Sequence, residues 1–462
     1  MGLRSRLFPR ALGLGISLGI SLSLGLLGDS GPAEAAPESS AERLYRRGIH
    51  CMEEIERSEC AIEHFEGLLD ENTRERALIT DAILRLVKLY RKEGLEEPMR
   101  QVLRRFWEAG GRRHRTGHLP YSARFLPSDL DVVAHVDVQM ALAAPLLKRL
   151  PPELSEAMTT CDEVRREALA DALMVRQAQH RSTKKSITTE AALAELRKEE
   201  AERRDRYKET EAKRKANSET AVSAPVFAES LCAAALALGT DSAEKWSRAA
   251  FALSYKDPRR SAAIVVIPGL AAQIEAGVAA GRLRPVASKR WVIVDHSYEE
   301  APVEIGNFDL DELTIAPAAL MPDFAATIER GKPTLNREVA KLVTTTPKDL
   351  IFFAVITGEV IRGIGIGGKS SRRGLLGSFL PEGFQIAATT HEYLGVFMRM
   401  PAKNPVRIKL LIDLATRFLL DEHDEETAKM LKNLDVAQAA DKRALLISYV
   451  LSPSQIQDLI FQ

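Results

Sequence analysis

The residues with the clearest chemical pattern form a glycine-rich segment late in the chain. The segment runs Gly363-Ile-Gly-Ile-Gly-Gly368-Lys369-Ser370, which has the spacing G-x-x-x-x-G-K-S. In a phosphate-binding loop of this kind, glycine amides surround a phosphate, the lysine reaches its outer oxygens and the serine holds magnesium. The pattern therefore raises the hypothesis of a nucleotide site.

The sequence around this segment argues against a nucleotide site. A phosphate-binding loop leads directly from a strand into a long helix. Here residues 358–362 separate the loop from the preceding apolar run, and Gly374, Gly377 and Pro381 soon follow it. We expect an exposed glycine-rich loop instead. Its basic side chains leave one alternative, a small anionic ligand bound by Gly363, Gly368, Lys369, Ser370, Arg372 and Arg373.

A histidine and an aspartate on one predicted strand have the spacing of part of a catalytic triad. His135 and Asp137 are two residues apart, so they lie on the same face of the strand. An internal repeat, described below, places Val355 and Thr357 at the equivalent positions. Because the repeat fills the histidine position with an apolar residue, we do not predict catalysis there.

Two further polar patterns are also interpreted as structural. Ser182 and Lys185 have the spacing of a serine–lysine acylase, but they lie in a highly charged segment without partner motifs. The acidic run from Asp421 to Glu426 could hold a divalent cation, but a charge run between two helices is usually a solvated loop. The sequence therefore predicts no catalytic residue, no cofactor and no metal site.

The four cysteines are Cys51, Cys60, Cys161 and Cys232. An even number in an exported protein favours disulfides over metal or catalytic thiols. Cys51 and Cys60 lie at the facing ends of adjacent predicted helices, whereas Cys161 and Cys232 flank a charged insertion. We predict the pairs Cys51–Cys60 and Cys161–Cys232. The alternative is that these cysteines are small buried hydrophobic residues.

The first 35 residues have the three parts of a secretory signal peptide. Arg4, Arg6 and Arg10 form a basic region, residues 11–28 are apolar, and Ala33-Glu-Ala35 fits a cleavage site. The alternative is a retained membrane anchor, but glycines and serines make the apolar run a poor spanning helix. We predict a protein that is exported to the periplasm or secreted, is cleaved near Ala35, and has no integral membrane span in the mature chain.

The composition is that of a globular protein large enough for two or three domains. The chain has 462 residues, of which 45% are hydrophobic and 28% are charged. Lys and Arg together number 64, as do Asp and Glu, so the formal net charge is zero. This balance does not favour a nucleic-acid partner or an anionic membrane surface.

Residues 36–118 are predicted to form a domain of paired helices, because apolar residues recur there at helical spacing. The pattern resembles tetratricopeptide-like repeats, chiefly through Gly48, Ala61, Phe65 and Tyr90. That resemblance implies a concave surface that binds a peptide or a partner domain. The alternative is a plain helical cap on the next domain.

The rest of the chain is organised around a repeated segment. Residues 127–136, Pro-Ser-Asp-Leu-Asp-Val-Val-Ala-His-Val, recur 220 residues later as Pro-Lys-Asp-Leu-Ile-Phe-Phe-Ala-Val-Ile at 347–356. In each copy Pro and Asp break the chain before a run typical of a buried strand. We predict two α+β modules, 119–305 and 306–462, behind the helical domain.

The elements of both modules suggest a strand–helix–strand–strand–helix–strand order, which is ferredoxin-like. Between the two copies the chain contains Gly331-Lys-Pro-Thr-Leu-Asn-Arg-Glu338 and then Thr345-Thr-Pro-Lys-Asp-Leu350 before an apolar strand. Through this run the C-terminal two thirds of the chain resembles uncharacterised bacterial envelope proteins with duplicated modules of this kind. In the first module we predict strands at 231–238, 249–255 and 289–294 and a helix at 263–280. In the second we predict strands at 384–388, 394–400 and 442–447 and a helix at 406–420.

Residues 160–226 interrupt the first module with a charged insertion. From 194 to 215 the sequence is nearly all charged, and oppositely charged residues recur at i,i+4. Such pairs support a solvated helix without an apolar face. We predict an arm that projects from the module or is partly disordered, and the functional alternative is a docking arm.

Taken together, these patterns predict an exported envelope protein that is not an enzyme. The helical domain would bind another envelope protein, and the two modules would act as a scaffold. The alternative is a protein, or an enzyme, that binds a small anionic ligand at the basic loop 363–373, or a protein that binds a lipid or another hydrophobic ligand between the sheets of the two modules.

Overall fold

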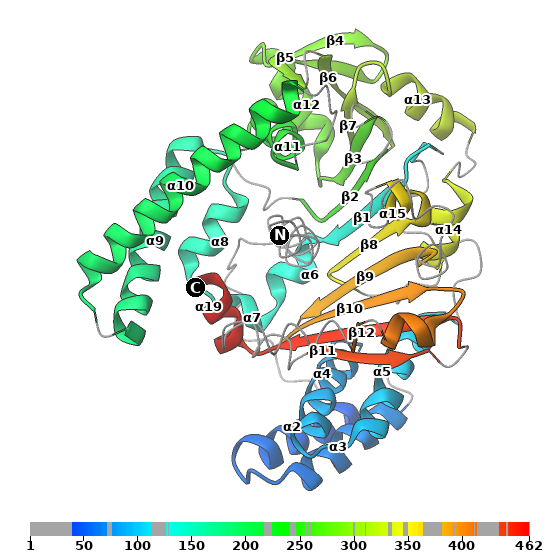
Figure 1. The fold of residues 1–462 in the computed structure, drawn as a ribbon. Helices are drawn as coiled ribbons and strands as arrows, with labels where there is room; N and C mark the ends of the chain where they lie inside the picture. Colours follow the sequence, from blue (N-terminus) through cyan, green and yellow to red (C-terminus); the bar gives the residue numbers. More distant parts are fainter. Residues whose placement is uncertain are drawn as a thin grey trace.

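A computed structural model gives the fold of the chain (Figure 1). It describes residues 39–71, 76–111, 126–127, 129–185, 187–216, 224–240, 246–254, 257, 260–298, 301–309, 311–330, 335–344, 350–363, 381–390, 393–410, 412–413, 434–439 and 442–461. The predicted signal peptide and the acidic run 421–426 lie outside these residues.

The centre of the molecule is one twelve-stranded antiparallel sheet. Its strand order is β11-β12-β10-β9-β8-β1-β2-β3-β7-β6-β5-β4, and Figure 1 shows it running between β4 and β11. The strands are β1 (Val132–Asp137), β2 (Arg248–Leu253), β3 (Ser261–Val266), β4 (Leu283–Ala287), β5 (Arg290–Tyr298), β6 (Ala301–Asp309), β7 (Glu312–Pro317), β8 (Phe352–Thr357), β9 (Gly383–Thr390), β10 (Leu394–Pro401), β11 (Leu434–Gln438) and β12 (Ala444–Leu451).

The two halves of the sheet meet at β1 and β8, which are the apolar runs of the repeated segment. Ala134 pairs with Ala354, its own repeat equivalent. The flanking pairs exchange equivalent positions, Val132 with Ile356 and Val136 with Phe352. The seam therefore has a local pseudo-twofold axis, as an isologous interface between two copies would have. On either side of it, two further strands follow in chain order.

The sheet is not two ferredoxin-like sheets, so that part of the prediction is wrong. A ferredoxin-like module has its own sheet, in which the first strand lies between the third and the fourth. Here β1 and β8 each lie beside the next strand of their own half and beside one another. The first strands cannot take ferredoxin-like neighbours because they pair with each other. The broader α+β class is confirmed, and β6 crosses the predicted module boundary at 305 and 306.

Residues 231–238, predicted as a strand, lie in helix α11 (Ala224–Ala237) and its C-terminal end. The run is composed mainly of Ala and Leu, which are good helix formers. It is apolar on every side, as expected of a helix that is largely buried. Leu231, Ala234 and Leu238 pack in the core cluster on one face of the sheet.

Residues 263–280, predicted as one helix, form β3 and then α12 (Leu270–Ala279). The β-branched run Ile-Val-Val-Ile favours the strand. Pro268 lacks an amide donor, and Gly269 has a φ of 71°, a conformation that glycine adopts readily. These two residues therefore separate the strand from the helix.

The N-terminal domain consists of four helices in sequence: α2 (Ser40–Glu53), α3 (Ser58–Asp70), α4 (Arg76–Lys92) and α5 (Glu96–Gly111). Ser39 begins α2 with a capping box, in which its hydroxyl accepts from the Glu42 amide and the Glu42 carboxylate accepts from the Ser39 amide. Consecutive helices pack against one another, and α2 also contacts α4. The predicted helices of this region are confirmed.

The remaining helices cover both faces of the sheet. One face packs against α4, α5, α13 (Met321–Arg330) and α14 (Arg337–Thr344) in one continuous core cluster. The other face packs against α11, α12 and smaller elements. The smaller elements are α6 (Val138–Ala143), α7 (Pro145–Lys148), the helical residues 405–410 and α19 (Pro453–Phe461). The short helix α15 (Gly358–Gly363) contacts β8 and β9.

The charged insertion forms a helical hairpin of α9 (Glu163–Lys185) and α10 (Thr189–Ala216), preceded by α8 (Pro152–Thr159). In Figure 1 it lies along one side of the molecule, with α8 and α19 near it. A small apolar cluster joins the two helices through Ala178, Ala192 and Leu196. The prediction of a helical arm is confirmed. No helix among the described residues is long and apolar enough to cross a membrane.

Candidate functional site

The N-terminal helices join the sheet through a buried ion pair. Arg85 and Asp81, one turn apart on α4, are fully buried, and the Arg85 Nε lies 2.7 Å from the Asp81 carboxylate. Arg85 Nη1 also donates to Glu53 on α2 at 3.1 Å, and its guanidinium lies 5.0 Å from the ring centre of Tyr393, between β9 and β10. Burial alone would lower the pKa of Arg85, but Asp81 and Tyr45 raise it above its ordinary value. The arginine therefore remains charged and connects three elements.

Apolar contacts complete this junction. The rings of Phe106 on α5 and Phe397 on β10 are stacked with their centres 4.1 Å apart. A Cβ atom at Gly395 would lie 2.3 Å from Leu84 on α4, so only a residue without a side chain lets the helix approach. Arg104 also donates to the backbone oxygen of Gln438 at the sheet edge. The inner side of the helical domain is thus occupied by the sheet.

The turn between α2 and α3 faces solvent and borders a cavity of about 330 Å³. Met52, Glu56 and Ser58 come from this turn and its flanking helix ends, and Lys88, Leu89 and Lys92 come from α4. Lys88 is half-buried, and its ammonium lies 4.5 Å from the Tyr393 ring centre. Burial lowers the pKa of Lys88, and the neighbouring Arg85 and Arg91 lower it further. The cavity has apolar, acidic and basic walls, which suits a protein surface better than a simple ion.

Both predicted disulfides are present. Cys51 at the end of α2 is bonded to Cys60 in the first turn of α3, with their Cα atoms 5.7 Å apart. Cys161 before α9 is bonded to Cys232 on α11, with a Cα separation of 5.1 Å. The second bond closes the base of the arm across 71 residues of sequence.

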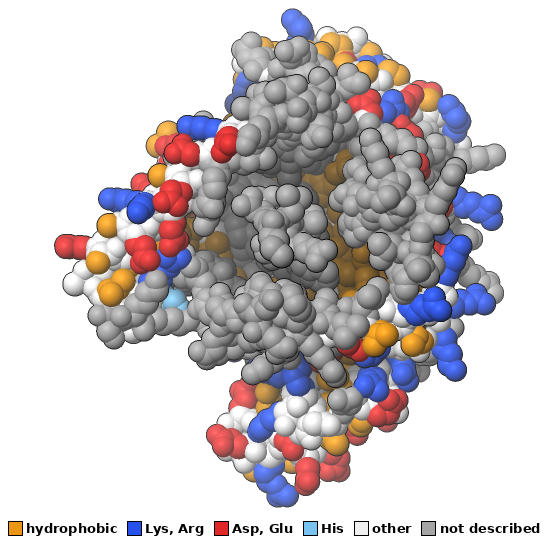
Figure 2. Space-filling model, in the orientation of Figure 1, with side chains coloured by type: hydrophobic (Ala, Val, Ile, Leu, Met, Phe, Trp, Pro, Cys, Tyr) orange, Lys and Arg blue, Asp and Glu red, His pale blue; other side chains and the backbone are white. Residues whose placement is uncertain are grey.

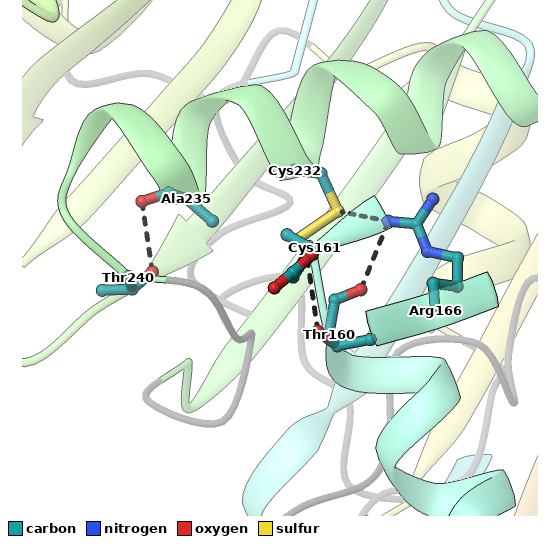
Figure 3. Close-up of a disulfide and its surroundings, with 7 residues drawn as sticks. Thr160, Cys161, Arg166, Cys232, Ala235 and Thr240 are labelled. Atoms are coloured by element: carbon teal, nitrogen blue, oxygen red, sulfur yellow. Dashed lines mark hydrogen bonds between the residues drawn. A yellow bond between two sulfur atoms is a disulfide. The ribbon is translucent and has the colours of Figure 1, made fainter. Parts of the chain in front are cut away.

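Figure 3 shows the base of the arm. The guanidinium of Arg166, in the first turn of α9, donates to the Thr160 backbone oxygen at 3.2 Å and contacts the Cys232 sulfur at 3.6 Å. The Thr160 hydroxyl accepts from the Asp162 amide. Thr240 donates to the Ala235 oxygen at the end of α11. These local bonds hold the arm at the disulfide.

Of the predicted ligand-binding residues in the glycine-rich loop, the structure describes Gly363 alone. Gly363 is the last residue of α15, which follows β8 directly. Gly368, Lys369, Ser370, Arg372 and Arg373 lie outside the described residues. The anionic-ligand hypothesis for this loop remains a prediction.

His135 and Asp137 have structural partners. The His135 ring is buried and stacks on Phe353, with ring centres 5.3 Å apart. Burial, aided by the charge of Arg248, lowers the pKa of His135 to about 4. Asp137 caps α6 by accepting from the Met140 amide at 2.9 Å, and it pairs with Arg248 at 3.3 Å. A neutral, buried histidine beside a capping aspartate supports structure rather than proton transfer.

Ser182 also has a structural role, because its hydroxyl donates to the Gln179 backbone oxygen at 2.8 Å within α9. Lys185 is the last residue of that helix.

Within the part of the chain that the structure describes, one further buried acid stands out. Burial, with the charge of Asp309, raises the pKa of Glu312 to about 7.

Sequence reasoning missed a cluster at the first disulfide. The potential ligand atoms of Cys51, Cys60 and His64 all lie within 4.8 Å of one another. The spacing of Cys60 and His64, one helical turn apart, was a signal for it, but the position of Cys51 depends on how α2 and α3 pack.

Comparisons with known proteins do not add to this description. No protein-family model, curated protein or solved structure matches the chain.

Proposed function

We propose that this chain is an exported, non-enzymatic scaffold of the bacterial cell envelope that binds another envelope protein through its N-terminal helices. The observation that carries the proposal is the placement of the cavity at the α2–α3 turn. The inner side of the helical domain is buried on the sheet, whereas this turn is exposed and bordered by residues of both charges and by Met52 and Leu89.

Packing within the helical domain supports tetratricopeptide-like hairpins. A Cβ atom at Gly48 on α2 would lie 2.6 Å from the Phe65 ring on α3. Ala61, Phe65 and Tyr90 are buried. Small and aromatic residues at these positions let α2 and α3 approach closely, as the resemblance implies. Because the sheet covers the inner side, the partner would contact the cavity at the turn.

The disulfides support the proposed location. Disulfides persist in oxidising compartments and are rare in the cytosol. In the described residues the four cysteines form two pairs. The two disulfides agree with export by the predicted signal peptide.

Site-specific photo-crosslinking in intact cells tests the proposal. A photoreactive residue at Glu56, in the cavity wall, should give one discrete crosslinked product. The same residue at Arg47, exposed elsewhere on α2, is the matched control and should not. Deleting residues 40–110 would be a poorer test, because it would uncover Phe397 and the apolar face of the sheet.

A crosslink at Glu56 that is lost in a Lys92→Glu variant would support binding at the cavity. Equal products from both positions, or none from either, would contradict it. Added protease after the outer membrane has been permeabilised supplies a separate check. A chain in the cytoplasm would stay protected by the inner membrane, and that result would contradict the envelope location.

A further inference from the structure

We propose that Cys51, Cys60 and His64 form a binding site for a thiophilic divalent cation such as Zn²⁺ when the disulfide is reduced. The inference does not depend on the binding partner proposed above. The disulfide and the metal-bound dithiol would be alternative states of the same three residues.

The two helices place the three ligands together. Cys60 and His64 are one turn apart on α3, so their side chains share one side of that helix. Cys51 comes from the last turn of α2. The close approach of Gly48 and Phe65, together with the buried Ala61 and Leu68, fixes α2 against α3 without the disulfide. The ligand positions are therefore held by helix packing as well as by the sulfur–sulfur bond.

The distances suit a tetrahedral ion. Zinc binds thiolate sulfur at about 2.3 Å and imidazole nitrogen at about 2.0 Å, which places its ligand atoms roughly 3.5–3.8 Å apart. In the disulfide state the two sulfurs are bonded to each other, and the His64 nitrogen lies within 4.8 Å of both. After reduction the two sulfurs can separate by side-chain rotation, since the Cα atoms are 5.7 Å apart. Two thiolates and one imidazole would leave the fourth position to water.

The surroundings favour a cation and allow its entry. Cys51 is buried, but Cys60 and His64 are partly exposed. The segment 51–64 holds one arginine and the exposed acidic residues Glu53, Glu54, Glu56, Glu59 and Glu63. This negative local charge would attract a metal ion.

The disulfide form changes into the metal-bound form by reduction of the disulfide followed by binding of the cation. A dithiol reductant gives two electrons and two protons to the Cys51–Cys60 bond, becomes a disulfide itself and leaves two cysteine thiols. The cation then displaces both thiol protons and accepts the neutral imidazole nitrogen of His64. In the reverse direction a disulfide oxidant would accept two electrons from the two thiolates, take up two protons to become a dithiol, re-form the Cys51–Cys60 bond and release the metal.

The test is a titration of the reduced protein with Co²⁺, whose bonds to thiolate give charge-transfer absorption. The protein carries Cys161→Ser and Cys232→Ser, so that Cys51 and Cys60 are its remaining thiols. We expect one equivalent of Co²⁺ to bind to the reduced protein and none to the disulfide form. Zn²⁺ should displace the Co²⁺.

The variant His64→Ala tests whether the imidazole of His64 is a ligand of the metal. Losing a direct ligand should weaken Co²⁺ binding by more than the ~10–100-fold effect of losing an outer partner. His50→Ala is the matched control, because His50 is an exposed histidine at the end of α2 that pairs with Glu54 at 2.8 Å. It should leave the Co²⁺ affinity unchanged.

The titration is repeated with the four-cysteine chain in case the double serine variant does not fold. Far-UV circular dichroism should show that the reduced protein keeps its helices or regains them with metal. Absence of Co²⁺ binding to reduced protein, unchanged binding by His64→Ala, or helices that neither survive reduction nor return with metal would each overturn the proposal.

Discussion

The two halves of the sheet meet through equivalent strands, but they carry different helical structures. The β8–β12 half is covered by α4 and α5, which share its apolar core. The β1–β7 half carries the arm, whose helices share a small cluster of their own and are joined to the molecule by a disulfide and by contacts of α9 with α8 and α19. A helical region that shares the main core should unfold with the sheet, whereas a charged arm held at its base can open separately.

The largest expected effect comes from breaking the shared core. Phe106 is 6% exposed and stacks on Phe397, so Phe106→Ala should lower the free energy of unfolding by about 3–5 kcal/mol. The loss should appear as a lower midpoint in denaturant unfolding of the whole protein, since the helices and sheet form one core.

Leu196→Ala in the arm is the matched control. Leu196 is also 6% exposed, but it packs within the arm's own cluster. Its replacement should speed amide hydrogen exchange in α9 and α10 and leave the global midpoint nearly unchanged. If both variants lowered the midpoint equally, the arm and the helical domain would not differ in how they join the sheet.

The buried ion pair of α4 gives the next largest effect. Asp81→Asn keeps the shape of the side chain but removes the charge that balances Arg85. A hydrogen bond to a charged group contributes about 1.5–3 kcal/mol, so we expect destabilisation of that order. Chemical denaturation monitored by tryptophan fluorescence would measure it.

An exposed pair in the same domain supplies the comparison. Asp70 pairs with Arg105 at 2.9 Å, and the Asp70 side chain is 75% exposed. Asp70→Asn should therefore cost less than about 1 kcal/mol, as is usual for surface pairs. Similar losses from the two substitutions would show that the Arg85 network is not what holds the helices to the sheet.

Local sequence patterns predicted the elements whose signals lie within a few residues. Pro and Asp before a β-branched or aromatic run identified β1 and β8, and helical periodicity identified α2 to α4. The insertion was recognisable because its charges pair along one helix. The prediction of a strand at the Ala-rich run of α11 was wrong because short apolar runs fit a strand or a buried helix equally well.

Long-range features could not be predicted in the same way. The pairing of Ala134 with Ala354 depends on which strand edges meet, and local periodicity does not contain that information. The same limit explains the missed cluster, since Cys51 reaches His64 only through the packing of α2 on α3. The burial of His135, by contrast, agrees with the repeat, which has a valine at that position.

His135 allows the two copies of the seam to be compared directly, since its repeat equivalent is Val355. The pKa of His135 falls from 6.5 to about 4 on folding. Between these values the unfolded chain binds a proton that the folded chain does not, so this residue's contribution is complete above pH 6.5 and is lost as the pH falls toward 4. A pKa that falls from 6.5 to about 4 corresponds to a loss of at most about 3 kcal/mol.

His135→Val should remove this pH dependence, because it places the residue of the second copy in the first. Unfolding free energies measured at several pH values between 4 and 7 would lose the rise with pH that His135 contributes to the parent protein. A difference in unfolding free energy between variant and parent that is the same at every pH would reflect packing alone. An unchanged slope would contradict the assignment of a neutral, buried histidine at the seam.

Glu312 provides a test of opposite sign in the same half of the sheet. Its pKa is raised from 4.5 to about 7 by burial and by Asp309, so the folded chain keeps a proton that the unfolded chain releases in this range. Its contribution is complete below pH 4.5 and is lost as the pH rises through 7. Glu312→Gln should therefore make the protein more stable at pH 8 than the parent, by on the order of 1 kcal/mol. The two slopes oppose each other in the parent protein, so the Glu312→Gln profile should rise with pH more steeply and the His135→Val profile should fall. If both single variants changed the slope in the same direction, the sign assigned to one of these groups would be wrong.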